Sequence, residues 1–421
     1  MKCLRLVSAA FAGLIVLSAC GGGRFAPAAP AAPVGGGVSA GAHSAKPATT
    51  QYKLLYSFTG TPDGASPLAG LLAVHGTLYG ATLNGGASGH CNLGCGTVFS
   101  VSRSGSESVV YSFKGNGSGQ TDGLWPFASL TALKGSLYGT TGGGGAGDGA
   151  VYTVTTAGSE RVLYPFTGGT DAQDPEAALI VAKGKLYGTS VYGGGSGCGG
   201  NGCGTVFQIS PTGTEKVLYR FAGGTDGSRV YAGVTYLHGA LYGATFAGGG
   251  SGCGGDGCGT IFELNPTTGK EQVLYRFSGT TDGAFPNGLT VAKGVLYGTT
   301  EGGGARSSGT FFSVTTTGTF QSLYSFKDIP DGNLPGANLL YLKGTLYGTT
   351  VGGGTKGDGS VFAITTAGSE NVLYSFTGGS DGSDPQAPLI ALKGTLYSTT
   401  YAGGGTGCGG GGCGTVFGVA P

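Results

Sequence analysis

Eight cysteines lie in four close pairs, and they form the residue pattern with the most definite chemistry in this chain. The pairs are Cys91 with Cys95, Cys198 with Cys203, Cys253 with Cys258, and Cys408 with Cys413. Two thiols this close in sequence can form a disulfide, and two pairs from neighbouring repeats can supply four thiolates to zinc. Each repeat holds both cysteines of a pair or neither, so we predict a disulfide within each loop. Bridges between adjacent loops and zinc sites are the alternatives.

One aspartate recurs in every repeat, after an aromatic segment of strand length. The seven copies are Asp63, Asp122, Asp171, Asp226, Asp282, Asp331 and Asp381. Seven carboxylates around one opening could bind calcium or the hydroxyl groups of a sugar. We prefer the simpler interpretation that each carboxylate accepts hydrogen bonds from backbone amides and fixes a turn. Beyond this calcium alternative, the sequence indicates no cofactor and no metal site.

Residues that break the repetition are the stronger candidates for ligand contact. Trp125 is the only tryptophan and follows an insertion in the second repeat, while Arg229 and Tyr231 are irregular in the fourth. An aromatic side chain on a loop can stack on a sugar or a partner, or it can pack beneath its own loop. We therefore add these three residues to the seven aspartates as candidates on a ligand-binding face.

Motifs of catalysis are absent from the sequence. No Gly-x-Ser-x-Gly elbow, phosphate-binding loop or His-Glu-x-x-His motif occurs. With only four histidines, acid-base chemistry would have to rest on carboxylates. This pattern favours binding over catalysis, with a carbohydrate-active glycosidase or lyase as an alternative.

A repeated scaffold positions these residues. The phrase Leu-Tyr-Gly-(Ala/Thr)-(Thr/Ser) occurs six times and its seventh copy reads Leu-Tyr-Ser-Thr-Thr, with the tyrosines 49 to 59 residues apart. Every repeat contains four short segments rich in β-branched and aromatic residues, and an X-Gly turn such as Lys183-Gly184 joins the first two. Each repeat is therefore predicted to be a four-stranded antiparallel meander.

Seven such meanders predict an all-β fold, a seven-bladed β-propeller over residues 51–421. The region begins with a lone fourth strand near Leu54 and ends with a third strand near Val416, so the N-terminal strand is expected to complete the last blade. An open β-solenoid is the alternative. In the propeller, the aspartate and cysteine loops share one face, opposite the X-Gly turns. There, a ring of lysines is expected to be neutralised by the glutamates that begin the fourth strands, which are Glu107, Glu160, Glu215, Glu271 and Glu370.

The repeating units, of the form VLYSFTGGxDGxxP followed by LYGTTxxGG and GTVF, resemble the GloVer tandem repeat of bacterial exported, surface-anchored proteins of the choice-of-anchor type. The match runs from Leu54 to Phe417, with local departures such as Ala172 after Asp171 and Phe320 at a position usually held by Glu. The resemblance implies export, surface attachment and a repeat fold. It carries no activity, so it assigns no catalytic residue.

The N-terminal segment has the pattern of a targeting signal. Residues 1–20 combine a basic start, a short apolar run and Leu17-Ser18-Ala19-Cys20, which resembles a bacterial lipobox and implies lipidation of Cys20. An ordinary secretory signal is the alternative. Residues 21–50 lack large apolar side chains and are predicted to be a disordered tether. We expect an exported protein, lipid-anchored at the outer membrane or cell surface, that meets the membrane only through this anchor.

Composition excludes some partners. Glycine supplies 94 of 421 residues and charged residues only 10%, as expected for short strands joined by turns. The net charge of +1 gives no electrostatic basis for binding nucleic acid. The sequence therefore predicts a monomeric surface repeat protein that serves as a binding scaffold for a glycan, peptide or protein. A structural envelope or adhesion protein without a specific small ligand is the main alternative.

Overall fold

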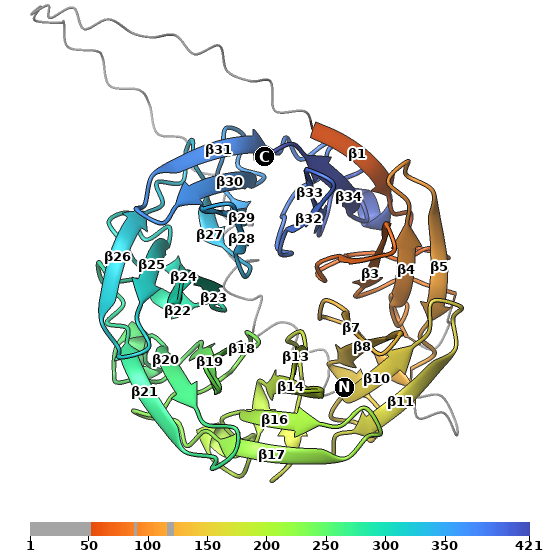
Figure 1. Ribbon diagram of the computed structural model, residues 1–421. Coiled ribbons are helices and arrows are strands. Elements are labelled where there is room, and N and C mark those ends of the chain that lie inside the picture. The colour runs from red at the N-terminus through yellow and green to blue at the C-terminus, as the bar shows by residue number, and fades with distance from the viewer. Residues whose placement is uncertain (1–51, 88–90, 116–121) are drawn as a thin grey trace, which may run out of the picture. The chain divides into compact units, whose positions relative to one another are not determined.

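Seven antiparallel sheets of four strands stand around a common axis in the computed structural model (Figure 1). The structure describes residues 52–421 except 88–90 and 116–121. Apart from three short 3-10 turns, its regular elements are all strands. The predicted seven-bladed β-propeller is confirmed. The predicted signal peptide, Cys20 and the tether all lie outside the described residues.

Each blade has four strands, which follow one another from the axis outward. Blades 1 to 3 comprise β2 (Leu72–Val74), β3 (Thr77–Thr82), β4 (Thr97–Val101) and β5 (Glu107–Ser112); β7 (Thr131–Leu133), β8 (Ser136–Thr141), β10 (Ala150–Val154) and β11 (Glu160–Pro165); β13 (Ile180–Ala182), β14 (Lys185–Ser190), β16 (Thr205–Ile209) and β17 (Glu215–Arg220). Blades 4 and 5 comprise β18 (Thr235–Leu237), β19 (Ala240–Thr245), β20 (Thr260–Leu264) and β21 (Glu271–Arg276); β23 (Thr290–Ala292), β24 (Val295–Gly302), β25 (Thr310–Val314) and β26 (Phe320–Ser325). Blades 6 and 7 comprise β28 (Leu340–Leu342), β29 (Thr345–Gly352), β30 (Ser360–Thr365) and β31 (Glu370–Ser375); β32 (Ile390–Leu392), β33 (Thr395–Thr400), β34 (Thr415–Val419) and β1 (Tyr52–Ser57).

The ring closes through β1, as the sequence predicts. This strand pairs antiparallel with β34, and Leu54 lies opposite Phe417. β34 pairs on its other side with β33, so blade 7 combines the first strand of the propeller with the last three. Tyr52 also stacks on Tyr374 of blade 6, with ring centroids 4.3 Å apart. The closing strand thus contacts two blades and leaves neither β1 nor β34 as an open edge.

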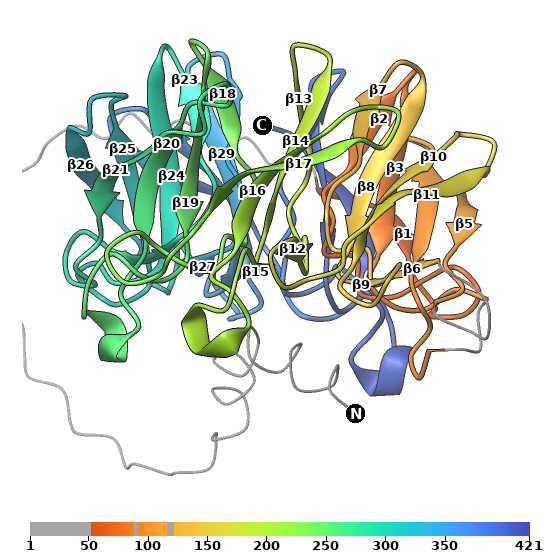
Figure 2. The ribbon, with the colours of Figure 1, turned by 90° about the horizontal axis from the view of Figure 1, so that it is seen from below.

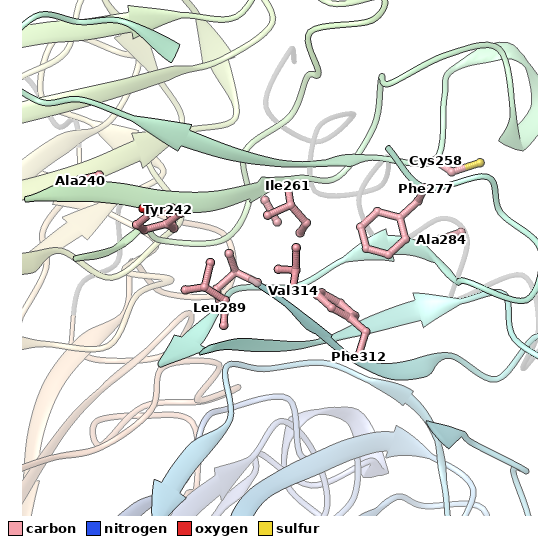
Figure 3. Packing of buried hydrophobic residues seen from close by; sticks show 11 residues of the cluster. Ala240, Tyr242, Cys258, Ile261, Phe277, Ala284, Leu289, Phe312 and Val314 are labelled. Atoms are coloured by element: carbon pink, nitrogen blue, oxygen red, sulfur yellow. The ribbon is translucent and has the colours of Figure 1, made fainter. Parts of the chain in front are cut away.

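Aromatic side chains pack the blades against one another. Phe277, which follows the outer strand of blade 4, meets Phe312 of blade 5 edge-on with ring centroids 5.3 Å apart (Figure 3). The same contact recurs between Phe58 and Phe99 at 5.0 Å. The glycine of the Leu-Tyr-Gly phrase makes room for this packing, because a Cβ at Gly80 would lie 2.5 Å from Cζ of Phe99. The glycine of the repeated phrase is therefore required by the packing of the neighbouring phenylalanine.

The two faces of the ring differ in their connections. Tight X-Gly turns lie on one face, and the longer connections, including the 3-10 turns of the cysteine loops, lie on the other (Figure 2). On this second face, four strand pairings join the connections between blades to segments within blades. They are β6 (Gly123–Leu124) with β9 (Gly143–Gly144), β12 (Ala172–Gln173) with β15 (Tyr192–Gly193), β22 (Ala284–Pro286) with β24, and β27 (Asn333–Pro335) with β29. We call it the loop face, and the cysteine and aspartate loops share it as expected.

Candidate functional site

The cysteines of the loop face form four disulfides, each within its own loop. The bonds join Cys91 to Cys95, Cys198 to Cys203, Cys253 to Cys258, and Cys408 to Cys413. The prediction of a disulfide within each loop is confirmed, and the alternatives of bridges between loops and of zinc sites are wrong. In these loops, no sulfur is left over for catalysis or metal binding.

Each disulfide supports the connection that leads to the next blade. A Cβ at Gly223 would lie 3.0 Å from Sγ of Cys198 and 3.1 Å from Sγ of Cys203, so a glycine is needed where this connection crosses the disulfide. Blade 2 has no cysteines, and there the carboxylate of Asp148 takes the same place against Gly168. The disulfides therefore belong to the scaffold of the loop face.

The seven repeated aspartates are held by hydrogen bonds from their own surroundings. Asp63 accepts from the hydroxyl of Tyr56 at 2.7 Å and from the backbone N–H of Thr59 at 3.0 Å. In every copy, the tyrosine seven or more residues earlier donates to the aspartate, which is the acceptor in the pairs Tyr111–Asp122, Tyr164–Asp171, Tyr219–Asp226, Tyr275–Asp282, Tyr324–Asp331 and Tyr374–Asp381. These bonds support the turn-fixing interpretation. A ligand role for the seven carboxylates stays a prediction, and no group of three or more potential ligands in the described residues is arranged to hold a metal ion.

The glutamates that begin the outer strands lie at the junctions between blades. Glu107 of blade 1 lies beside Tyr56 and Asp63, which belong to the strand and loop that precede this blade. Its Oε1 atom is buried without a hydrogen-bond partner, and burial together with the charge of Asp63 raises its pKa to about 7. The same unpartnered atom recurs at four more junctions, in Glu160, Glu215, Glu271 and Glu370. The expectation that these glutamates neutralise the lysine ring is wrong, because each glutamate is affected by the charge of the repeated aspartate that precedes its blade and by no lysine of that ring. The outer strands, which these glutamates begin, run along the perimeter of the ring (Figure 1).

Seven equivalent positions, one per blade, combine one backbone conformation with six different kinds of side chain. Each lies three residues after the repeated aspartate and has φ between 51° and 61°, and together they are Ser66, Trp125, Asp174, Arg229, Phe285, Leu334 and Asp384. We call them the variable ring. Such left-handed φ values cost a residue with a side chain roughly 1–2 kcal/mol, so the scaffold must enforce them.

Backbone hydrogen bonds to two blades enforce this conformation. The N–H of Trp125 donates to the carbonyl of Cys95 in the preceding blade at 3.0 Å, and its own carbonyl accepts from Gly142 of its own blade at 3.0 Å. Arg229 repeats both bonds, to Cys203 at 2.9 Å and from Phe246 at 2.9 Å. The scaffold thus fixes the backbone at one position per blade on the loop face, and the side chain at this position differs between blades. Sequence reasoning named Trp125 and Arg229 separately, and the structure shows that they occupy the same position in different blades.

Blades 3 to 5 bring aromatic side chains together at this ring. Tyr231 meets Phe246 edge-on with ring centroids 5.2 Å apart, and Phe246 stacks on Phe285 at 4.8 Å. Tyr192 lies within interacting range of the Tyr231 hydroxyl. Of the ten candidates named from the sequence, Tyr231 and Arg229 belong to this cluster, Trp125 lies on the ring in blade 2, and the seven aspartates lie at the blade junctions.

Carboxyl groups that sequence reasoning missed lie beside these rings. Burial and the nearby charge of Asp174 raise the pKa of Glu176 to about 8, and burial raises the pKa of Glu301 to about 7. Both charges act on Tyr231, whose own pKa is raised by burial and then by Glu176. Burial and Asp148 raise the pKa of Asp174 to about 7. A comparison of the seven repeats position by position would have found Glu176 and Glu301, because other repeats carry different residues there.

Two comparisons place this chain among known proteins. A family model described as the Gloeobacter/Verrucomicrobia repeat matches residues 35–201 and 196–417. The chain belongs to this repeat family. The Gloeobacter/Verrucomicrobia repeat and the four disulfides both fit an exported protein. Within residues 52–421 and outside the two gaps, no helix is long and apolar enough to cross a membrane.

Some solved structures are similar to this member of the Gloeobacter/Verrucomicrobia repeat family. A putative 6-phosphogluconolactonase from Bacteroides uniformis matches with a TM-score of 0.50 at 13% identity, over 77% of this chain and 89% of that one. The gluconolactonase XC5397 from Xanthomonas campestris matches with a TM-score of 0.43 at 15% identity, over 94% of this chain and 98% of that one. At 13% identity, the likeness to the putative 6-phosphogluconolactonase concerns the fold alone. The comparison with curated proteins gave no match.

Proposed function

We propose that this protein is an exported binding protein whose ligand site is the centre of the loop face, where the variable ring lies. One observation carries the proposal. The seven positions share their φ values and their pattern of backbone hydrogen bonds, yet hold serine, tryptophan, aspartate, arginine, phenylalanine and leucine side chains. Features that serve the scaffold recur in every blade, so a position that the scaffold holds constant while its side chain varies is suited to recognition.

The ligand is a glycan, a peptide or a protein segment. Trp125 and the Tyr231–Phe246–Phe285 cluster offer aromatic surface on the loop face, and aromatic side chains dominate the binding energy of many recognition sites. A structural envelope or adhesion role without such a ligand remains the alternative function. The lipid anchor at Cys20 and the monomeric state belong to the same proposal. Labelling with a fatty acid, lost in C20A, tests the first, and light scattering of the purified protein tests the second.

Binding arrays test the proposed site. The purified protein is applied to glycan and peptide arrays, and a hit is then measured in solution with W125A and with K134A as a matched control. Lys134 is exposed and sits on an X-Gly turn of the opposite face. Loss of a central aromatic contact should weaken binding by about thirtyfold, or about 2 kcal/mol, and K134A should bind as the wild type does. An array hit that W125A, Y231A and F246A all leave unchanged would refute this site, and silence on every array would favour the structural role.

Turnover on the same arrays tests the enzyme alternative. The raised pKa values of Glu176 and Glu301 would suit general acid catalysis on a glycan. Release of labelled fragments by the wild type, abolished in E176Q or E301Q, would show catalysis. Binding without release would leave the protein as a binding scaffold.

A further inference from the structure

We propose that the blade 3 to 5 part of the loop face, formed by Glu176, Tyr231, Phe246, Phe285 and Glu301, binds the cationic group of the ligand, an amine or a guanidinium. This inference rests on the proposed function and names the chemistry of one part of the same site. It starts from two carboxyl groups that reach the same tyrosine from different blades. Glu176 precedes the inner strand of blade 3, and Glu301 lies near the end of β24 in blade 5.

Neither carboxyl group has a partner of its own. In the described part of the chain, no hydrogen bond or ion pair involves the side chain of Glu176 or Glu301. Both groups are deeply surrounded by protein, yet each residue keeps a partly exposed surface. An unpaired carboxylate in such surroundings is costly, so these groups would gain most from a charge-bearing ligand.

The nearest cation does not supply that charge. Arg229 of the variable ring points to Asp256 in the cysteine loop of its own blade, with 3.7 Å between Nη1 and Oδ2. Burial and the charge of Asp174 act on Glu176, burial alone acts on Glu301, and Arg229 relieves neither group. The groups around the two carboxyls are thus Asp174 and Tyr231, with Tyr192 beside the latter. Arg229 is the cation that acts on these two tyrosines, and it is already paired with Asp256.

The aromatic cluster completes the match to a cation. Tyr231, Phe246 and Phe285 pack against one another, and each keeps a partly exposed surface. An exposed ring face attracts a cation through its π electrons and also contacts an alkyl chain attached to it. An anionic ligand would be repelled wherever these groups are ionised, and a neutral sugar would gain no charge–charge attraction from them. A lysine or arginine side chain of a peptide, or an amino sugar, carries both features that the site offers.

Binding of a cation must release protons near neutral pH. The cation favours the ionised carboxylates, so it drives off the protons that Glu176 and Glu301 hold in the free protein. Affinity for a permanently charged amine should therefore rise between about pH 6 and pH 8. A structural role for the two residues would not produce this coupling.

Calorimetric titration of the whole protein with 1,5-diaminopentane tests the inference, and 1,5-pentanediol serves as a neutral probe of the same length. The diamine should bind, with proton release seen as a dependence of the measured enthalpy on the buffer, and the diol should bind at least about tenfold more weakly. E176Q, E301Q and F246L should each weaken the diamine by about tenfold, whereas E263Q in β20 should not. Because three variants are measured, the test remains informative if one of them fails to fold.

Other outcomes separate this inference from the proposed function. Equal binding of diamine and diol, or full binding by E176Q and E301Q, would overturn the cation site. If an array ligand still depended on Trp125, the binding function would stand while the cation site failed. If no array ligand and no diamine bound, both proposals would fail.

Discussion

Replacement of Glu107 by glutamine should stabilise the protein at alkaline pH and leave its stability unchanged at acidic pH. Glu107 lies at the junction where β1 closes the ring, beside Tyr56 and Asp63. Burial and Asp63 raise its pKa from 4.5 to about 7, and its Oε1 atom has no hydrogen-bond partner. The folded protein therefore holds a proton there over a pH range in which the unfolded chain has lost it.

The sign and the size of the effect follow from this difference. A raised folded-state pKa contributes stability that is fully present below about pH 4.5 and is lost as the pH rises through about 7. One pKa unit corresponds to about 1.4 kcal/mol, so the full difference amounts to about 3 kcal/mol. Because Glu107 is only partly buried, solvent screening reduces this to about 1 kcal/mol. Glutamine keeps the shape of the protonated acid and removes the charge.

Guanidinium unfolding of wild type and E107Q at about pH 5 and pH 8 provides the assay. E107Q should exceed the wild type by about 1 kcal/mol at the higher pH and match it within a few tenths at the lower. E263Q in β20 provides the matched control for the chemical change from glutamate to glutamine. An equal gain at both pH values, or a larger gain at pH 5, would refute the reasoning. E107Q and E215Q lie at separate junctions, so their gains should add.

Three further changes test the scaffold by chemical denaturation. Tyr152 replaces the phenylalanine of the other blades and its buried hydroxyl has no partner, so Y152F should gain about 1 kcal/mol; a loss would contradict this account. Thr141 also lacks a partner, whereas Thr245 bonds to the strand beside it, so T141V should be nearly neutral and T245V should cost about 1–3 kcal/mol. Removal of the Cys253–Cys258 disulfide by double serine substitution should cost about 2 kcal/mol, and a reductant should remove this difference from wild type.

The architecture was predictable because the same pattern of four strands recurs in seven repeats of the sequence. The phase of the strands, with a fourth strand first and a third strand last, indicated the pairing of Leu54 with the strand of Phe417. The pairing of cysteines followed from their joint presence or absence in a repeat, which only an interaction between the two explains. The role of the glycine in the Leu-Tyr-Gly phrase came only from the structure, in which Gly80 gives space to Phe99.

The candidate site was harder to predict because it depends on contacts between residues of different repeats. Glu107 was expected beside the lysines of the turn face, since a strand start was assigned to that face without regard to blade twist. The twist instead brings it to Asp63 of the preceding connection. Glu176 and Glu301 lie 125 residues apart, and only the curvature of the ring brings both near Tyr231. A search for motifs within one repeat cannot reveal a cluster built from three repeats.

Pairing of β1 with β34 also determines when the ring can close. Tyr52 lies opposite Val419, so the two paired strands come from the two ends of the repeat region and meet only when the blades between them are in place. Until then, β1 and β34 each leave an unpaired edge that another chain could join. Removal of residues 415–419 would leave β1 without its partner and would expose the edge of β33 as well, so one short strand protects two edges.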